Sequence, residues 1–436
     1  MPGAVNAVRG RVLLMWFLCT ASPAFAGQEA PDGASRQAAD GDSASAAQAG
    51  DASVGEEPRP CAFKARLLPF GSDKERHCGS DVAVIAGVIV SGSGLSGGAN
   101  YRYFNLLDSP IDAQLRGMFS VRGYHDYRLS IGLLDARNST LELNAADARI
   151  SSLFNTSTRK APGSALYVEM RYRDYPRHTF YGPGNRAIED NRTDYALRGV
   201  SAEGVWQRQI SARFGVSART GLLTLHVGRG QDDSVVDFEQ RFIPATIAGA
   251  VEQPRFVTAG VGFEDDTRSD PRMPEDGRLI AASLRTFRAD RPNLSFTRFT
   301  AEVRTYRRAF WRGVFGTRFI FAGDFSARGS STPFYVRQSL GGTDTLRGFD
   351  SYRFADRTLV HATAMYRYRA NRYMEIIPFY DIGTTANGVS KLDFGARRTS
   401  PGIGIRARTD KQILADFAYA WSTEGGRVVF TIGAAL

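Results

Sequence analysis

The chain has 436 residues, of which 43% are hydrophobic and 11% aromatic, and it carries a formal net charge of +10 at pH 7. Its 50 Arg and 5 Lys are interspersed with 45 acidic residues, and charges of both signs mixed in this way exclude a nucleic-acid-binding surface. After the first 26 residues, no run of about 18 apolar residues occurs, which excludes a membrane-spanning helix.

Residues 1–26 have the layout of a cleaved secretory signal. A basic start with two arginines precedes an apolar stretch over residues 12–19, and small residues mark a cleavage site after Ala26. Cys19 raises the alternative of lipid attachment, but this modification needs a small preceding residue and Leu18 stands there. The sequence therefore predicts export to the periplasm.

No independent domain is predicted between the signal and residue 81. Residues 27–60 consist mainly of Ala, Gly, Ser, Asp and Gln, which cannot bury enough apolar surface to fold, so we expect a disordered linker. Residues 61–80 follow as a short periplasmic segment. Its Cys61 and Cys78 are a disulfide candidate, since the periplasm is oxidising; a redox-active pair is the alternative.

Residues 81–436 change to segments of about ten residues in which apolar and polar positions alternate, the signature of a membrane β-barrel. In residues 297–308, for example, Phe299, Ala301 and Val303 alternate with charged and polar side chains. Charge lies on one face in segment after segment, as a polar lumen requires and a soluble sandwich does not. The sequence predicts an all-β, antiparallel transmembrane barrel in the bacterial outer membrane.

The charged faces of these segments are predicted to line the lumen. Residues 314–325 direct four phenylalanines outward, and residues 166–173 and 416–421 repeat the alternation. The candidate lumen-facing polar residues are Arg298, Glu302, Arg304, Arg318, Asp324, His361 and Arg367.

The chain ends inside a strand. Phe430, Ile432, Gly433 and Leu436 are the expected C-terminal strand signal, and this strand should pair with the first one, because an open edge in lipid leaves backbone groups unsatisfied. The length of the region fits 16 strands, an even number as in single-chain bacterial barrels. One surplus strand candidate, between residues 140 and 151, is assigned to a long connection.

Two motifs carry a family resemblance: SLGGTDTLRGF from residue 339 and FYDIG at residues 379–383. They resemble the sixth extracellular loop of the BamA/TamA-like outer-membrane assembly factors (bacterial surface antigen barrels), whose Arg-Gly-Phe/Tyr tip folds into the lumen, and the family's Phe-x-Asp-x-Gly strand motif. The resemblance implies a loop–lumen lock made of Arg347, Gly348, Phe349, Asp381 and Gly383. In a partly desolvated lumen the planar Arg347 guanidinium needs a carboxylate and can bind one bidentately. The alternative is a solvated loop arginine and an unrelated strand aspartate.

Three further stretches agree with this resemblance: FYGPGN at residues 180–185, DTRSDPRMPEDG at residues 266–277, and Gly433 in the closing strand. The sequence departs from the family at Met365, where related strands often carry Glu, and at Leu436, where Phe is usual. The family's insertases carry POTRA domains, and patatin-type relatives carry a lipase domain with a Gly-x-Ser-x-Gly motif. Residues 27–80 show neither, so we expect a barrel-only member.

The resemblance implies insertion or translocation of proteins or lipids at the outer membrane, through a seam between the first and last strands. A passive pore or structural surface barrel is the alternative, and an outer-membrane hydrolase is a second one. No catalytic residue, metal site or cofactor is predicted, since His361 is better explained as a polar wall residue and no metal-ligand spacing appears. Expected partners are outer-membrane lipids, lipopolysaccharide, a periplasmic accessory protein and the host's barrel-assembly machinery, but no nucleic acid.

Overall fold

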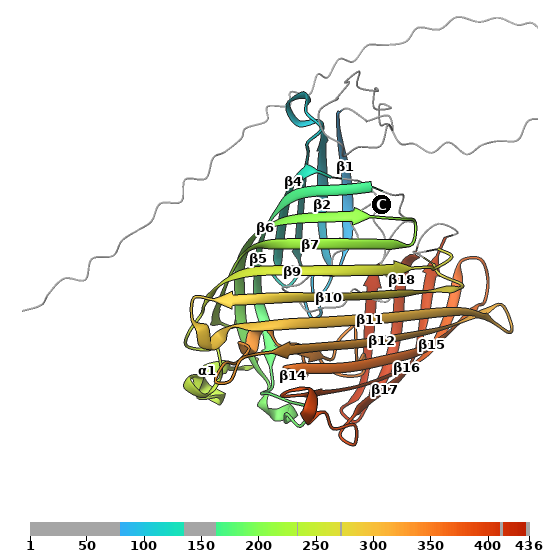
Figure 1. Cartoon of the computed structure of the whole chain (residues 1–436). Coiled ribbons are helices and arrows are strands. Elements are labelled where there is room, and N and C mark those ends of the chain that lie inside the picture. The colour runs from blue at the N-terminus through green and yellow to red at the C-terminus, as the bar shows by residue number, and fades with distance from the viewer. Residues whose placement is uncertain (1–78, 135–162, 233, 271–272, 410–412, 433–436) are drawn as a thin grey trace, which may run out of the picture. The chain divides into compact units, whose positions relative to one another are not determined.

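The computed structural model describes residues 79–134, 163–232, 234–270, 273–409 and 413–432 (Figure 1). The predicted signal, the linker, Cys61, Cys78 and the surplus candidate at residues 140–151 lie outside the described residues. In the part of the chain that is described, no helix is long and apolar enough to cross a membrane.

The described residues form one large antiparallel sheet of 16 long strands, as predicted. Each strand pairs with the next long strand along the chain. The strands are β1 (Gly79–Gly87), β2 (Ser96–Phe104), β3 (Asp112–Ser120), β4 (His125–Leu133), β5 (Gly163–Phe180), β6 (Thr193–Gln209), β7 (Phe214–Arg229), β9 (Arg255–Asp266), β10 (Gly277–Ala289), β11 (Phe296–Ala309), β12 (Gly313–Phe325), β15 (Thr358–Arg369), β16 (Met374–Ala386), β17 (Arg398–Arg408), β18 (Ile413–Ser422) and β19 (Gly425–Ile432).

The remaining elements are short and lie in the connections. β8 (Val236–Asp237) pairs in parallel with the start of β6, and β13 (Gln338–Leu340) pairs with β14 (Phe354–Asp356) in a separate two-stranded sheet. The helical segments are α1 (Phe238–Arg241), η1 (Leu106–Asp108), η2 (Glu189–Asn191), η3 (Pro244–Thr246), η4 (Pro292–Leu294), η5 (Phe334–Val336) and η6 (Val389–Lys391).

The two faces of the sheet differ in polarity. On β12, Phe319 is 45% exposed on the outer face, whereas its neighbour Arg318 is 1% exposed on the inner face. β5 repeats this pattern, with Met170 and Tyr172 exposed and Arg171 buried. Successive side chains of a strand point to opposite faces, so the apolar side chains form the outer surface and the charged ones are enclosed.

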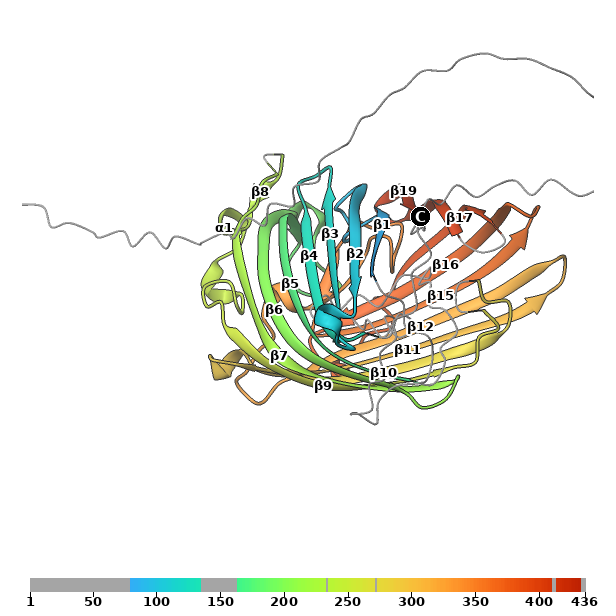
Figure 2. The same cartoon turned by 90° about the horizontal axis from the view of Figure 1, so that it is seen from above.

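The connections alternate between two ends of the sheet, because neighbouring strands are antiparallel. We call the end with the β1–β2, β5–β6, β7–β9 and β12–β15 connections the loop end, and the end where β1 begins and β19 stops the turn end. Figure 2 shows β19 beside β1. Over the described residues, no strand register joins these two strands, and we call their boundary the seam.

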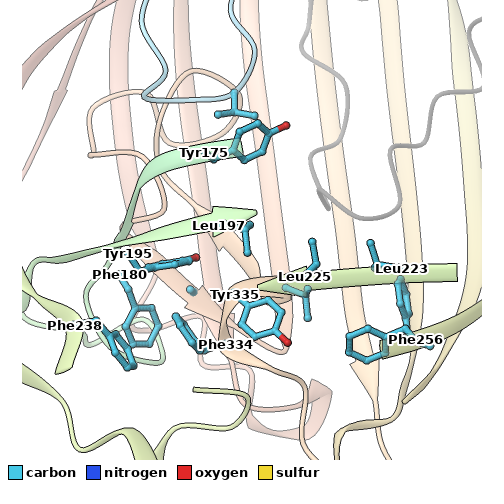
Figure 3. Packing of buried hydrophobic residues seen from close by; sticks show 14 of the residues in the cluster. Tyr175, Phe180, Tyr195, Leu197, Leu223, Leu225, Phe238, Phe256, Phe334 and Tyr335 are labelled. Carbon is cyan, nitrogen blue, oxygen red and sulfur yellow. The ribbon is translucent and has the colours of Figure 1, made fainter. Parts of the chain in front are cut away.

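An aromatic cluster packs at the loop end and fixes where the β12–β15 connection starts (Figure 3). Phe334 of η5 lies 4.8 Å from Phe238 of α1, 5.0 Å from Tyr195 of β6 and 5.1 Å from Phe180 of β5, measured between ring centroids. All four rings are buried. Aromatic pairs at this spacing stabilise the fold by about 0.5–1.5 kcal/mol each, beyond the contribution of the area that they bury. The first part of the β12–β15 connection is therefore held in place by packing at η5.

Candidate functional site: a loop folded into the lumen

The β12–β15 connection, residues 326–357, contains the hairpin of β13 and β14 and a tip between these strands, residues 341–353. The tip turns sharply at its start, where Gly341 and Gly342 have φ values of +110° and +86°. A Cβ on Gly341 would lie 2.0 Å from the carbonyl oxygen of Asp350. Glycine is needed here because other residues rarely adopt positive φ and have no room for a side chain.

Arg347 in the tip binds Asp381 on β16. Its Nε donates to Oδ2 and its Nη2 to Oδ1, each over 2.8 Å, and the two side chains are 8% and 0% exposed. Thr363 of β15 donates a third hydrogen bond of 2.8 Å to Oδ1, while the guanidinium carbon lies 3.2 Å from the ring centroid of Phe379. The carboxylate thus has a bidentate charged partner, the stronger form of such a bond.

Gly348 and Gly383 allow the tip to approach the sheet closely. The Gly348 amide donates to Ser400 Oγ of β17 over 2.6 Å, and a Cβ at this position would lie 2.4 Å from the carbonyl oxygen of Trp421 in β18. At Gly383 of β16, a Cβ would lie 2.8 Å from Leu340 of β13. A side chain at either position would force its neighbour to move, and at Gly348 that neighbour is backbone.

Phe349 anchors an apolar cluster between the loop and the wall. Its ring packs edge-on against that of Phe354, with centroids 5.2 Å apart. Burying each large apolar side chain stabilises by about 1.5–3 kcal/mol, so the cluster holds the loop in place alongside the ion pair. The fully buried members are Ile320, Leu340, Leu346, Phe349, Phe354 and Leu359.

The charged residues of β11 and β12 bind one another and also the loop. Glu302 accepts hydrogen bonds from Arg304 over 2.6 Å and from Arg318 over 2.7 Å, and Arg318 donates onward to the carbonyl oxygen of Asp344 in the tip over 2.9 Å. These wall side chains are buried. The acid neutralises part of the positive charge, and the spare guanidinium nitrogen holds the loop backbone.

A second wall pair acts on the start of the loop. Arg298 of β11 binds Asp324 of β12 over 2.6 and 2.8 Å, and it donates to the carbonyl oxygen of Val336 in η5 over 2.5 Å. Val336, Asp344 and Arg347 thus each bind a charged side chain of the lumen wall, in addition to the hydrogen bond between Gly348 and Ser400.

Comparison with protein families identifies this architecture. The model described as "Omp85 superfamily domain" matches residues 138–435, more than half of the chain. The chain belongs to the Omp85 superfamily. This membership agrees with the resemblance carried by the loop and strand motifs, and it identifies the chain as an outer-membrane β-barrel of that superfamily.

Solved structures similar to this Omp85 chain include BamA from Haemophilus ducreyi lacking POTRA domains 1–3, at 16% identity and a TM-score of 0.59 over 82% of this chain and 70% of that one. CdiB from Escherichia coli matches at 11% identity with a TM-score of 0.49, over 80% of this chain and 62% of that one. CdiB from Acinetobacter baumannii matches at 11% identity with a TM-score of 0.47, over 81% of this chain and 59% of that one. The chain thus spans less than two thirds of either CdiB. At these identities, the BamA match shows the fold alone. A search of curated proteins gave no match.

Two further predicted wall residues of the Omp85 barrel lie on β15. His361 is fully buried and stands opposite Gly383 of β16. Arg367 is buried and donates to the carbonyl oxygen of Pro274 in the β9–β10 connection, which is the stretch that resembled the family's Asp-Thr-Arg connection. Among the described residues, no group of three or more His, Cys, Asp or Glu side chains could hold a metal ion.

The predicted C-terminal strand signal is only partly within the described residues. Phe430 lies exposed on the outer face of β19, and Ile432 is the last residue of that strand. Gly433 and Leu436 lie outside the described range.

Sequence reasoning missed the polar residues that surround Asp381. Thr363 stands opposite Asp381 on β15, and Ser400 stands opposite it on β17. A single Ser or Thr in a strand has no distinguishing pattern, so only the strand register shows that all three form one row across the wall. Once that register is known, the residues opposite Asp381 become the obvious candidates.

Proposed function

We propose that this protein inserts or translocates proteins or lipids at the outer membrane through the seam between β1 and β19, while the loop keeps the lumen closed. The observation that carries the proposal is the burial of the Arg347–Asp381 pair deep in the lumen. A 16-stranded barrel is wide enough to conduct, so a seated loop leaves the seam as the route for a client. Family membership supports the same class of activity.

In this proposal the loop end faces the cell surface and the turn end faces the periplasm. Outer-membrane lipids and lipopolysaccharide surround the apolar outer face, and a periplasmic accessory protein delivers clients to the turn end. The chain's own insertion depends on the host's barrel-assembly machinery, which recognises the end of β19.

The proposal is tested by placing the folded protein in lipid vesicles and adding a small urea-denatured barrel protein as client. We expect the client to fold faster than in empty vesicles, as followed by its gel mobility with and without heating. A passive pore would instead leave the client's folding rate unchanged and release a small trapped dye from the vesicles. A hydrolase would also leave that rate unchanged, and lipid or peptide products would accumulate.

A further inference from the structure

Two adjacent residues of the loop tip contact opposite sides of the seam. The Asp350 carboxylate pairs with Arg427 of β19 and accepts a hydrogen bond of 2.8 Å from the Tyr181 hydroxyl. The next residue, Ser351, lies with its Oγ 2.7 Å from the Oγ of Ser91 in the β1–β2 connection. The last strand and the first hairpin are thus tied to neighbouring positions of one short segment.

The contact with Ser91 is made from two directions. Besides Ser351, the amide of Thr343 donates to Ser91 Oγ over 3.3 Å. Gly342 lies so close that a Cβ there would be 2.0 Å from the same oxygen. The tip therefore fits closely over the β1–β2 connection, and Ser91 of that connection contacts both the start and the end of the tip.

A cavity of about 580 Å³ lies beside these contacts. Its lining includes Asp350, Arg427, Val428 and Phe430. Val428 and Phe430 are 61% and 48% exposed on the outer face of β19, whereas Arg427 meets the tip on the inner face. The lining also includes Ser91 of the β1–β2 connection and Gly342 and Ser351 of the tip, so the cavity borders both of the contacts described above.

We propose that Asp350 and Ser351 form a clasp across the loop end of the seam, so that β1 and β19 separate there only when the tip releases Arg427 or Ser91. The inference rests on the proposed route through the seam and adds its regulation. Seating of Arg347 on Asp381 holds the clasp in register, because the two sites are three residues apart in the chain. Coupling of this kind is reciprocal: an opened seam loosens the tip, and an unseated tip frees the seam.

The clasp is tested by measuring the distance between β1 and β19 with spin labels at positions 84 and 428, where the natural valines are both exposed on the outer face. All natural cysteines are replaced by Ser, and Val84→Cys and Val428→Cys carry the labels in detergent-solubilised, folded protein. With the double substitution Asp350→Ala and Ser351→Ala, we expect the distance distribution to broaden and its mean to lengthen by at least about 5 Å, one strand spacing.

Glu424→Gln is the matched control. Arg353 of the tip donates to Glu424 in the β18–β19 turn over 3.0 Å, and the substitution removes the charge of this partner. The contact joins the tip to one side of the seam only, because it does not involve the β1–β2 connection. We expect the labels to report the natural distance in this variant. An unchanged distance in the Asp350/Ser351 variant, or equal lengthening in the control, would overturn the proposal.

A disulfide experiment covers the case in which the double variant fails to fold. Ser91→Cys and Ser351→Cys replace hydroxyl oxygens that are 2.7 Å apart, so the oxidised bond should form in the folded protein, and its yield should fall several-fold when Arg347→Ala is added. Failure to form the bond, or an equal yield with Arg347→Ala, contradicts the clasp. Neither experiment uses a client, so each tests the clasp independently of the proposed function. If the clasp forms as expected but the protein does not speed client folding, only the proposed function is rejected.

Discussion

At the scale of single residues, the site is governed by a carboxylate that has no access to water. Asp381 is fully buried, and its charge is compensated by hydrogen bonds from Arg347 and Thr363. The Arg347 guanidinium is itself held in place by stacking on the Phe379 ring. Removing the charged partner of a buried ion costs more than removing the whole pair, because the remaining charge is left without compensation.

Arg347→Ala should therefore lower the free energy of unfolding by about 3–5 kcal/mol. Urea unfolding followed by gel mobility without heating measures this. Arg186→Ala is the control, since Arg186 lies 3.5 Å from Asp393 in a pair whose side chains are 84% and 55% exposed, and exposed pairs contribute about 0–1 kcal/mol. Equal effects of the two substitutions would show that the lumen pair is not buried in solution.

Gly348→Ala tests the close approach of the tip to the wall. The added Cβ would meet the Trp421 carbonyl at 2.4 Å, so the tip must move away and we expect increased protease cleavage within residues 341–353. Gly228→Ala on β7 is the control, because nothing lies within 4 Å of its Cβ position. A tip that stays protected in Gly348→Ala would contradict the described fit.

The residue scale also separates what sequence reasoning can find from what it cannot. Arg347 and Asp381 belong to short motifs whose resemblance to family motifs can be seen in the sequence alone. Ser91 and Ser351 are unremarkable in sequence. They are 260 positions apart and come together only because the fold returns the loop to the first hairpin.

At the scale of elements, alternation within each strand decides which face meets lipid. Phe319→Arg at the middle of β12 should destabilise the folded protein by about 2–4 kcal/mol, since the guanidinium would lie near the bilayer midplane. Phe325→Arg, at the end of the same strand, should cost only about 0–1 kcal/mol near the interface. Unfolding in lipid vesicles measures both, and similar costs would mean that β12 does not cross the membrane at this depth.

The presence of many long strands was predictable because a period of two, weak within one segment of about ten residues, recurs in segment after segment. The short ones were not. β8, β13 and β14 have two or three residues each, too few for any period, and they exist because the loops that carry them pack against β6 and inside the lumen.

At the scale of the whole sheet, strand length is distributed unevenly. β1 and β19 have 9 and 8 residues, whereas β5 and β6 have 18 and 17. At about 3.3 Å per residue, the strands at the seam are about half as long as the longest ones. β2, β3 and β4 have 9 residues each as well, so short strands continue from the seam along one side of the sheet. Over the described residues no strand register joins β1 to β19, and the loop contacts at Asp350 and Ser351 lie at this boundary.

The state of the lumen is the central question, and single-channel recording in planar bilayers addresses it most directly. If the loop occupies the lumen through Arg347 and Asp381, the natural protein should give small, flickering currents, and Arg347→Ala should give larger and longer openings. A large, steady conductance in the natural protein, unchanged by Arg347→Ala, would mean that the lumen is an open pore and that the loop does not close it.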